Sequence, residues 1–169
     1  MRSTAAAIAP AAFPWADGAP RAGLYLHPGQ VVAAARPTAV TTILGSCVSV
    51  CLFDELRGVG GINHFLLPAG AADGATAGRF GNGAVPELLR RLERLGSGPG
   101  TLRAKVFGGA CVLEAFRGGR RHLGQANVEA AHELLAGYGI PVAGGETGGT
   151  RGRKLIFHTD DGTCWVRPI

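Results

Sequence analysis

The sequence predicts an α/β fold: a compact layered sandwich of mixed, mostly antiparallel β-sheet with about two main helices. Three observations lead to this prediction. Short runs rich in β-branched residues outnumber the helical stretches, and most of them are joined by turns of a few residues. Two segments carry apolar residues at helical spacing. Short connections favour antiparallel neighbours over a doubly wound parallel sheet, in which a helix would separate each pair of strands.

The first half of the chain reads mainly as strands. Residues 40–44 form a β-branched run, Gly45, Ser46 and Cys47 interrupt it, and a second apolar run follows. The turn at 27–29 leads into an extended segment, and Pro68 ends a later strand because it lacks a backbone donor. We expect extended structure over 25–35, strands over 40–44, 48–53 and 62–67, a polar turn over 54–61 and a loop over 69–78.

Two helices are expected in the second half. Within 85–95 the apolar residues fall on one helical face, Pro86 suits the first turn and Gly96 suits the C-terminal cap. The second helix is expected within 127–138, with Asn127 as its N-cap and Gly139 closing it. Further strands are expected over 104–107, 155–158 and 164–167, the last two joined by a turn at Asp161 and Gly162.

Length and composition indicate one globular domain. The chain has 169 residues, of which 46% are hydrophobic and 17% charged, and this supports a real core. Residues 1–20 lack the continuous apolar stretch of a secretory signal, so we expect a disordered tail there and a single domain over 21–169. No apolar run is long enough to span a bilayer. We therefore expect a cytoplasmic protein without membrane insertion.

The charge pattern argues against nucleic acid as the partner. The net charge is +5, and of the 17 basic residues only Lys105 and Lys154 are lysine. Arginine favours bidentate contacts with carboxylates or phosphates. The arginines are dispersed and form no basic stripe with interleaved aromatic residues, so an acidic protein surface is the better expectation.

The four cysteines are expected to be free thiols. In a chain without a signal peptide and with an adequate core, disulfides are not needed. Cys47 and Cys51 are close in sequence, but no second Cys or His pair completes a zinc site. The glycine-rich segment 148–155 lacks the Gly-Lys-Ser/Thr ending of a phosphate loop and precedes a strand. We expect neither a metal nor an organic cofactor.

Cys47 and His64 are the best candidates for chemistry. A nucleophilic thiol needs access, a base and a site for the oxyanion, and the turn before Cys47 can aim backbone N–H groups at a developing charge. His64 is a polar residue in an otherwise apolar strand, and pairing of the two strands would bring it to the thiol as a base, giving an ion pair. Single cysteines and histidines are more often structural, so local chemistry alone leaves both interpretations open. Cys51, Cys111 and Cys164 are expected to belong to the core.

Several ordered blocks of sequence are similar to those of the CheD family. They extend from Gly23 to the C-terminus, and they comprise Tyr-Leu-His-Pro-Gly at 25–29, Thr-Thr-Ile-Leu-Gly-Ser-Cys-Val at 41–48, Gly-Ile-Asn-His-Phe-Leu-Leu-Pro at 61–68, Arg-Phe-Gly-Asn at 79–82, Ala-Lys-Val-Phe-Gly-Gly-Ala at 104–110 and Gly-Arg-Lys at 152–154.

The resemblance implies a specific enzyme. It implies a hydrolase that deamidates glutamine side chains of bacterial chemoreceptors (methyl-accepting chemotaxis proteins) to glutamate, with Cys47 as nucleophile and His64 as base. It also implies a third member, Thr41, six residues before the cysteine, with the neighbouring Thr42 facing the other side of the strand. The fold implied is a compact α/β sandwich, and no cofactor is implied.

The partners implied are chemoreceptor cytoplasmic domains and the phosphatase CheC, and we expect a monomer. Two other functions stay open from the sequence. One is a chemotaxis regulatory protein that acts mainly by binding, through CheC. The other is a receptor glutamate methylesterase, since the same thiol machinery would cleave an ester.

Overall fold

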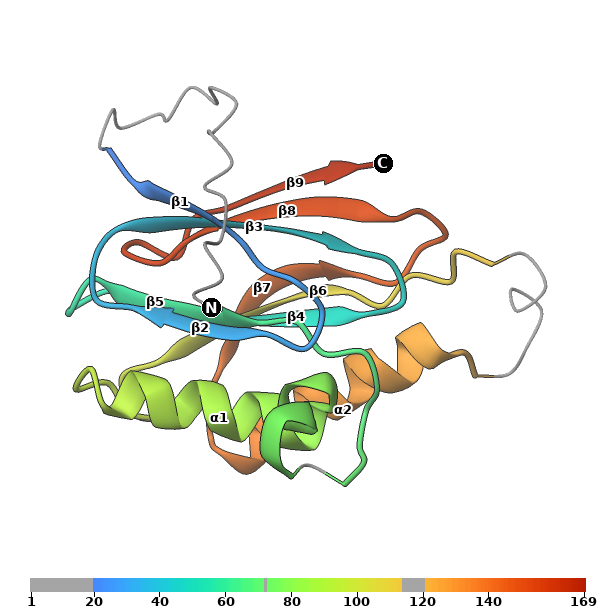
Figure 1. The fold of residues 1–169 in the computed structure, drawn as a ribbon, viewed down its shortest axis with the longest axis horizontal. Coiled ribbons are helices and arrows are strands. Elements are labelled where there is room, and N and C mark those ends of the chain that lie inside the picture. Colours follow the sequence, from blue (N-terminus) through green and yellow to red (C-terminus); the bar gives the residue numbers. More distant parts are fainter. Residues whose placement is uncertain (1–19, 72, 114–120) are drawn as a thin grey trace, which may run out of the picture.

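The computed structural model describes residues 20–71, 73–113 and 121–169. Within these residues two β-sheets lie one above the other, and two α-helices cover the outer face of the larger sheet (Figure 1). This three-layer arrangement confirms the predicted α/β sandwich, with the strands divided between two sheets. The tail expected over 1–20 lies outside the described residues except for Pro20.

The smaller sheet has four strands in the order β1-β3-β8-β9. Its strands are β1 (Ala22–Tyr25), β3 (Thr38–Leu44), β8 (Arg153–His158) and β9 (Cys164–Pro168). β8 pairs antiparallel with both β3 and β9, whereas β1 pairs parallel with β3. The predicted turn between β8 and β9 is confirmed, and Gly162 there has φ +73°, which favours glycine.

The larger sheet has five strands in the order β2-β5-β4-β6-β7. Its strands are β2 (Val31–Ala34), β5 (Val59–Asn63), β4 (Val48–Asp54), β6 (Arg103–Gly108) and β7 (Val142–Thr147). Only the edge pair β6–β7 is parallel. The sequence did not predict β7, because it is exposed along its whole length and two of its six residues are glycine, so no apolar alternation marks it.

Both expected helices are present, but each begins earlier than expected, and Pro86 lies inside the first of them and not in its first turn. α1 (Gly81–Glu93) is followed by Gly96 at φ +89°, as predicted. A 3₁₀ helix, η1 (Gly74–Arg79), occupies most of the predicted loop. α2 (Leu123–Gly137) starts before its expected beginning, and the side chain of His122 caps it by accepting the backbone N–H of Gln125. The assignment of Asn127 as N-cap is therefore wrong, and this residue lies inside the helix.

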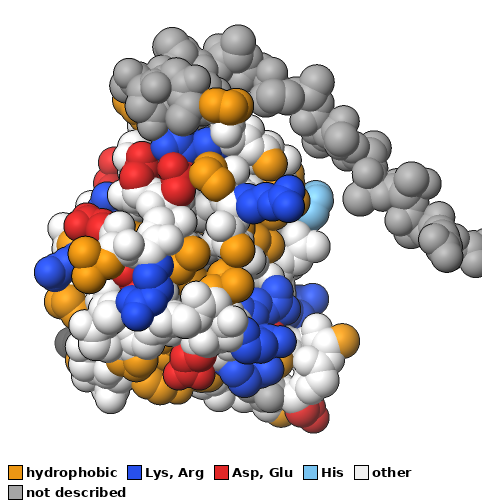
Figure 2. All heavy atoms as spheres, turned by 90° about the vertical axis from the view of Figure 1, so that its left-hand side faces the viewer, with side chains coloured by type: hydrophobic (Ala, Val, Ile, Leu, Met, Phe, Trp, Pro, Cys, Tyr) orange, Lys and Arg blue, Asp and Glu red, His pale blue; other side chains and the backbone are white. Residues whose placement is uncertain are grey.

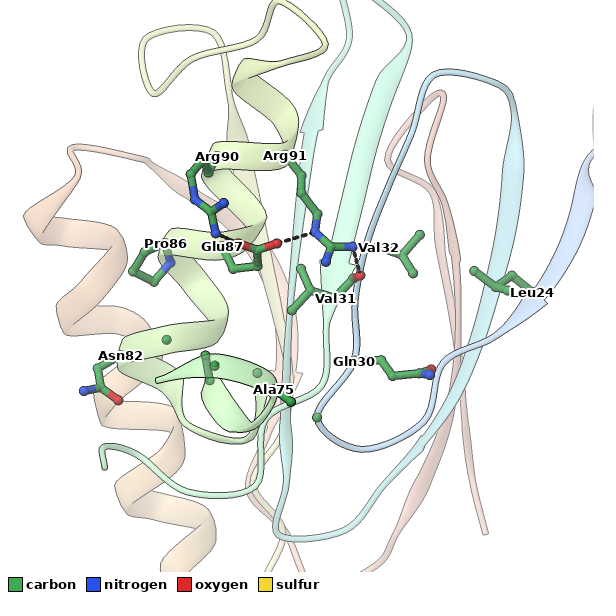
Figure 3. A pocket seen from close by; sticks show the side chains of 15 residues that line it. Leu24, Gln30, Val31, Val32, Ala75, Asn82, Pro86, Glu87, Arg90 and Arg91 are labelled. Atoms are coloured by element: carbon green, nitrogen blue, oxygen red, sulfur yellow. Dashed lines mark hydrogen bonds and ion pairs between the residues drawn. The ribbon is translucent and has the colours of Figure 1, made fainter. Parts of the chain in front are cut away.

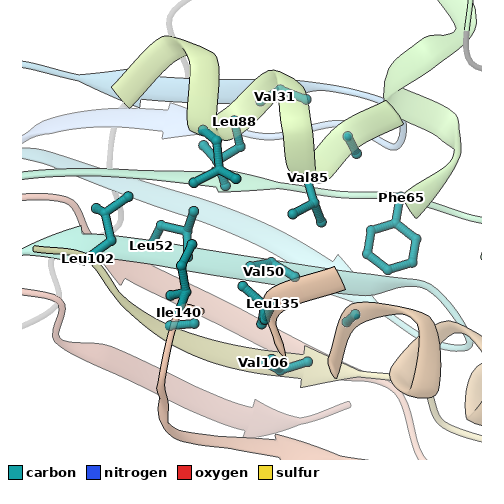
Figure 4. Close-up of a cluster of buried hydrophobic side chains, with 14 of the residues drawn as sticks. Val31, Val50, Leu52, Phe65, Val85, Leu88, Leu102, Val106, Leu135 and Ile140 are labelled. Atoms are coloured by element: carbon teal, nitrogen blue, oxygen red, sulfur yellow. The ribbon is translucent and has the colours of Figure 1, made fainter. Parts of the chain in front are cut away.

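Two apolar clusters hold the layers together. The first lies between the larger sheet and the helices and includes Val50, Leu52, Leu88 and Leu135 (Figure 4). The second lies between the two sheets and includes residues from β3, β4, β5 and β8. Side chains of one strand alternate between the clusters, since successive residues point to opposite faces. Among the described residues, no helix is long and apolar enough to cross a membrane.

The basic surface is divided into separate groups. On the face drawn in Figure 2, Lys and Arg side chains form several patches, with Asp and Glu beside some of them. Arg21 binds both Asp160 and Asp161, and Arg121 pairs with Glu129. These ion pairs neutralise part of the excess positive charge locally.

Candidate active site

Cys47 lies at the point where the chain leaves the smaller sheet and enters the larger one. The two-residue turn Gly45–Ser46 separates it from β3, and β4 begins at the next residue. Its carbonyl accepts a hydrogen bond from the backbone N–H of Gly109 (2.8 Å), and the carbonyl of Gly45 accepts one from Ala110 (2.8 Å). The turn is thus tied to the segment after β6, while the thiol itself is half-buried and free.

Gly108 allows this close approach of two backbone segments. Its φ is +106°, and a Cβ atom at this position would collide with the carbonyl oxygen of Cys47. Only glycine combines that backbone conformation with that contact. The glycines at the end of β6, Gly108 and Gly109, therefore help to hold the cysteine turn, which is the segment Gly45–Cys47.

His64 follows the last residue of β5 and is 2% exposed. Its Nδ1 lies 2.9 Å from the hydroxyl oxygen of Thr42, and that hydroxyl lies 2.9 Å from the carbonyl of Leu26. The one hydroxyl proton of Thr42 is donated to the carbonyl, so the threonine oxygen accepts from Nδ1–H. The tautomer assigned in this way leaves Nε2 as the basic nitrogen. Nε2 is buried and has no hydrogen-bond partner among the described residues.

The threonine that contacts His64 is Thr42, so the choice of Thr41 for that contact is wrong. Val40, Thr42 and Leu44 are fully buried and point into the space between the sheets. Thr41 is half-buried on the opposite face of β3, at the position that pairs with Tyr25 and Ile156. The family resemblance selected Thr41, but strand alternation brings its neighbour Thr42 to the histidine.

Cys47 and His64 occupy the same face of the larger sheet. The backbones of Val48 and Phe65 exchange two hydrogen bonds (3.1 and 3.0 Å), and Cys51 pairs with Ile62 in the same register. Cys51 and Ile62 belong to the cluster between the sheets, and Cys47 packs against that cluster.

By alternation, His64 points the same way as Ile62. The common register places His64 opposite Ser49, and Cys47 is two residues before Ser49 on the same face. Such diagonal neighbours are about 7–8 Å apart between Cα atoms.

The electrostatics of the free protein favour a neutral pair. Burial raises the pKa of the Cys47 thiol above its ordinary value of 9.0, and the residue's own backbone N–H partly opposes this shift. Burial lowers the pKa of His64 to about 4; the carbonyl of Leu26 opposes that change and nearby His27 adds to it. At neutral pH the free protein therefore holds a thiol and a neutral imidazole, not the ion pair expected from the sequence.

Two polar residues near the site were missed. Asn127 of α2 is fully buried and donates to the carbonyls of Ser46 and Leu66, both at 2.9 Å. Ser49 is also fully buried, opposite His64. Asn127 lies one helical turn before Ala131 on the buried face of α2. A polar residue among the apolar residues of that face is the sequence signal that could have identified it. The other cysteines are not part of this arrangement: Cys51 and Cys111 are buried and Cys164 is half-buried.

A separate groove of about 900 Å³ lies between β2, η1 and α1 (Figure 3). Its lining contains neither Cys47 nor His64. Glu87 lies between Arg90 and Arg91 and pairs with both, and Arg91 also donates to the carbonyl of Val31. The charges of the groove are thus largely satisfied within the protein.

Comparisons with a family model and with known proteins both relate this chain to CheD proteins. The family model described as CheD chemotactic sensory transduction matches residues 66–168. The probable chemoreceptor glutamine deamidase CheD 1 of Anaeromyxobacter dehalogenans is 53% identical over 171 residues, covering 99% of both chains.

Two further relatives are the probable chemoreceptor glutamine deamidases CheD of Sulfurimonas denitrificans and CheD 2 of Geobacter sulfurreducens. The first is 36% identical over 86% of this chain and 93% of its own. The second is 42% identical over 86% of this chain and 89% of its own. Because the family model covers more than half of the sequence and these relatives cover most of it, the chain belongs to the CheD family.

Proposed function

We propose that this protein hydrolyses the side-chain carboxamide of glutamine residues in chemoreceptors, with Cys47 as nucleophile and His64 as general base. The observation that carries the proposal is the orientation of His64. Its Nδ1 is held by Thr42, and its basic Nε2 has no partner within the described part of the chain, on the sheet face that Cys47 shares. The names of the relatives supply the substrate class.

The first half-reaction forms a thioester. Nε2 of His64 takes the proton of the Cys47 thiol as the sulfur attacks the carbonyl carbon, because a neutral imidazole can accept a proton at neutral pH. The oxyanion of the tetrahedral intermediate lies near the turn that contains the Cys47 backbone N–H, which is suited to stabilise it. The C–N bond then breaks, and the imidazolium gives its proton to the leaving nitrogen, which departs as ammonia.

The second half-reaction releases glutamate. His64 takes a proton from water, the resulting hydroxide attacks the thioester carbon, and the C–S bond breaks. The sulfur recovers the proton from the imidazolium, and the enzyme returns to its starting state. Thr42 positions the imidazole and, because its oxygen accepts from Nδ1–H, stabilises the imidazolium that forms in both halves. Thr41 has no part in this mechanism.

The test is incubation of the purified protein with chemoreceptor cytoplasmic domains, followed by peptide mass mapping and measurement of ammonia. Deamidation predicts that defined glutamines become glutamate, with one ammonia released for each conversion. Tight binding to receptor or to CheC with neither change would support the regulatory binding function instead. Loss of methanol from a methylated receptor, without ammonia, would support the methylesterase.

A further inference from the structure

We propose that Asn127 is a positioning residue for this chemistry, whose side-chain amide joins the turn before Cys47 to the segment after His64 and so fixes the nucleophile relative to its base. This inference rests on the proposed function, because it assigns Asn127 a role in the same site.

The hydrogen bonds of Asn127 define this role. The side chain is fully buried, and Nδ2 donates to the carbonyls of Ser46 and Leu66, at 2.9 Å each. Ser46 immediately precedes Cys47, and Leu66 lies two residues after His64. In the register set by Val48 and Phe65, Leu66 is the residue opposite Cys47. One carboxamide thus bridges the two chain segments at the point where the nucleophile sits.

The bond to Ser46 also reaches the thiol through a single peptide group. The Ser46 carbonyl and the Cys47 N–H belong to the same peptide unit, and that N–H favours the thiolate form of Cys47. A hydrogen bond to the carbonyl polarises the peptide and strengthens its N–H as a donor. Asn127 therefore acts on Cys47 without touching it.

The position of α2 is fixed independently at a second point. Gly124, one turn before Asn127, and Gly109 lie so close together that a Cβ atom on either would collide with the backbone of the other. Gly109 is the residue that donates to the Cys47 carbonyl. The start of α2 is thus seated directly on the segment that holds the cysteine turn, and this makes Asn127 a rigid support.

Stability alone does not account for an asparagine at this position. Its Oδ1 is buried with no hydrogen-bond partner among the described residues, and a buried unpaired acceptor costs free energy. The neighbours on the same helix face, Ala131 and Leu135, are apolar. Two donated bonds to the cysteine and histidine segments give a reason for keeping the polar side chain.

The experiment uses two variants, with a control in the same helix. Asn127→Ala removes the amide, and Asn127→Asp keeps its shape but cannot donate at neutral pH when ionised. Leu135→Ala is the control, because it weakens the packing of α2 against the sheet without contacting either carbonyl. Folding is checked by circular dichroism. The reactivity of Cys47 is measured as its rate of alkylation by iodoacetamide over a range of pH, and peptide mass spectrometry identifies the alkylated cysteine. This measurement needs no receptor.

We expect Asn127→Ala to slow alkylation of Cys47 severalfold and to move its pH profile toward higher pH, whereas Leu135→Ala leaves that profile in place. With receptor as substrate, we expect kcat to fall about tenfold or more with little change in KM, because small displacements of reacting groups are costly. A folded Asn127→Ala protein with the wild-type alkylation profile and wild-type kcat would overturn the proposal.

Two further measurements separate failure of this proposal from misfolding of the variants and from failure of the proposed function. If both Asn127 variants fail to fold, the side-chain amide resonances of Asn127 are followed by NMR in wild-type protein during alkylation of Cys47. A shift supports the coupling, and unchanged resonances overturn it. If wild-type protein deamidates no receptor, the proposed function fails, while the alkylation profiles still decide whether Asn127 controls Cys47.

Discussion

The hydroxyl oxygen of Thr42 lies 2.9 Å from Nδ1 of His64, and this contact crosses from the smaller sheet to the larger one. It sets the imidazole so that Nε2 is the basic nitrogen, and His64 and Cys47 share the face of the larger sheet that looks toward the smaller one. The contact also explains why the two sheets must pack correctly before the site exists. The predictions below each depend on this geometry or on the electrostatics that it creates.

Replacing Thr42 by valine should impair catalysis more than the same change at Thr41. Thr42→Val removes the acceptor for Nδ1–H but keeps the shape, so the histidine loses its orientation and a hydrogen bond that strengthens when it is protonated. A bond to a charged group contributes roughly 1.5–3 kcal/mol, so kcat should fall by about 10- to 100-fold. Thr41→Val, on the opposite face of the same strand, should stay within about twofold of wild type. Steady-state kinetics with receptor domains as substrate measure kcat for both variants. A larger loss of kcat in Thr41→Val than in Thr42→Val would contradict the contact between Thr42 and His64.

In the free enzyme, the rate of Cys47 alkylation should depend on pH as it does for a thiol whose pKa is ordinary or raised. Because burial raises the pKa of Cys47 and lowers that of His64, no ion pair forms before substrate binds. Alkylation of Cys47 by iodoacetamide should therefore rise steadily with pH into the alkaline range above 9. A rate that is already constant between about pH 5 and pH 8, as a thiolate–imidazolium pair gives, would show that the neutral pair is wrong.

Stability should fall on mild acidification because of His64. Its pKa is lowered to about 4 in the folded protein from an ordinary 6.5, so the unfolded chain takes up a proton in this interval before the folded one does. The contribution is fully present above pH 6.5 and is lost as pH falls to about 4, by on the order of 3 kcal/mol. Urea unfolding of wild type and of His64→Gln between pH 7 and pH 4 measures it. Equal slopes of stability against pH in the two proteins would refute the buried neutral histidine.

A methyl group at Gly108 should disrupt the cysteine turn. The residue has φ +106°, and an added Cβ would meet the Cys47 carbonyl oxygen, which must then move. We expect Gly108→Ala to lose at least about 2 kcal/mol of unfolding free energy and most of the activity. Gly144→Ala is the control, because a Cβ there meets nothing within 4 Å. Chemical denaturation compares the two, and similar losses would mean that the close approach at Gly108 is unimportant.

Much of the fold could be predicted because its signals are local. β3 and β4 carry β-branched or apolar runs interrupted by the Gly45–Ser46 turn, and α1 carries a clear apolar stripe. β7 could not be predicted in this way, since its exposed, glycine-containing segment is held mainly by pairing with β6. Its place depends on tertiary contacts and not on local preference.

The site could be predicted only in part from the sequence. Cys47 and His64 stood out by residue type and by their turn and strand contexts. The choice between Thr41 and Thr42 depended on which face of β3 looks inward, and spacing along the chain does not decide that. Asn127 was taken for a helix cap because asparagine favours that position, whereas His122 caps the helix and Asn127 is buried.

The proposed mechanism is tested most directly by comparing a variant of Cys47, which immediately precedes β4, with a variant of Cys51, which lies within β4. Cys47→Ala and Cys51→Ala remove thiols from the same face of the larger sheet, one at the site and one in the core. Each folded protein is incubated with chemoreceptor cytoplasmic domains, and conversion of glutamine to glutamate is mapped by peptide mass spectrometry. The mechanism predicts no conversion by Cys47→Ala and clear conversion by Cys51→Ala. Conversion by Cys47→Ala at the wild-type rate would show that Cys47 is not the nucleophile.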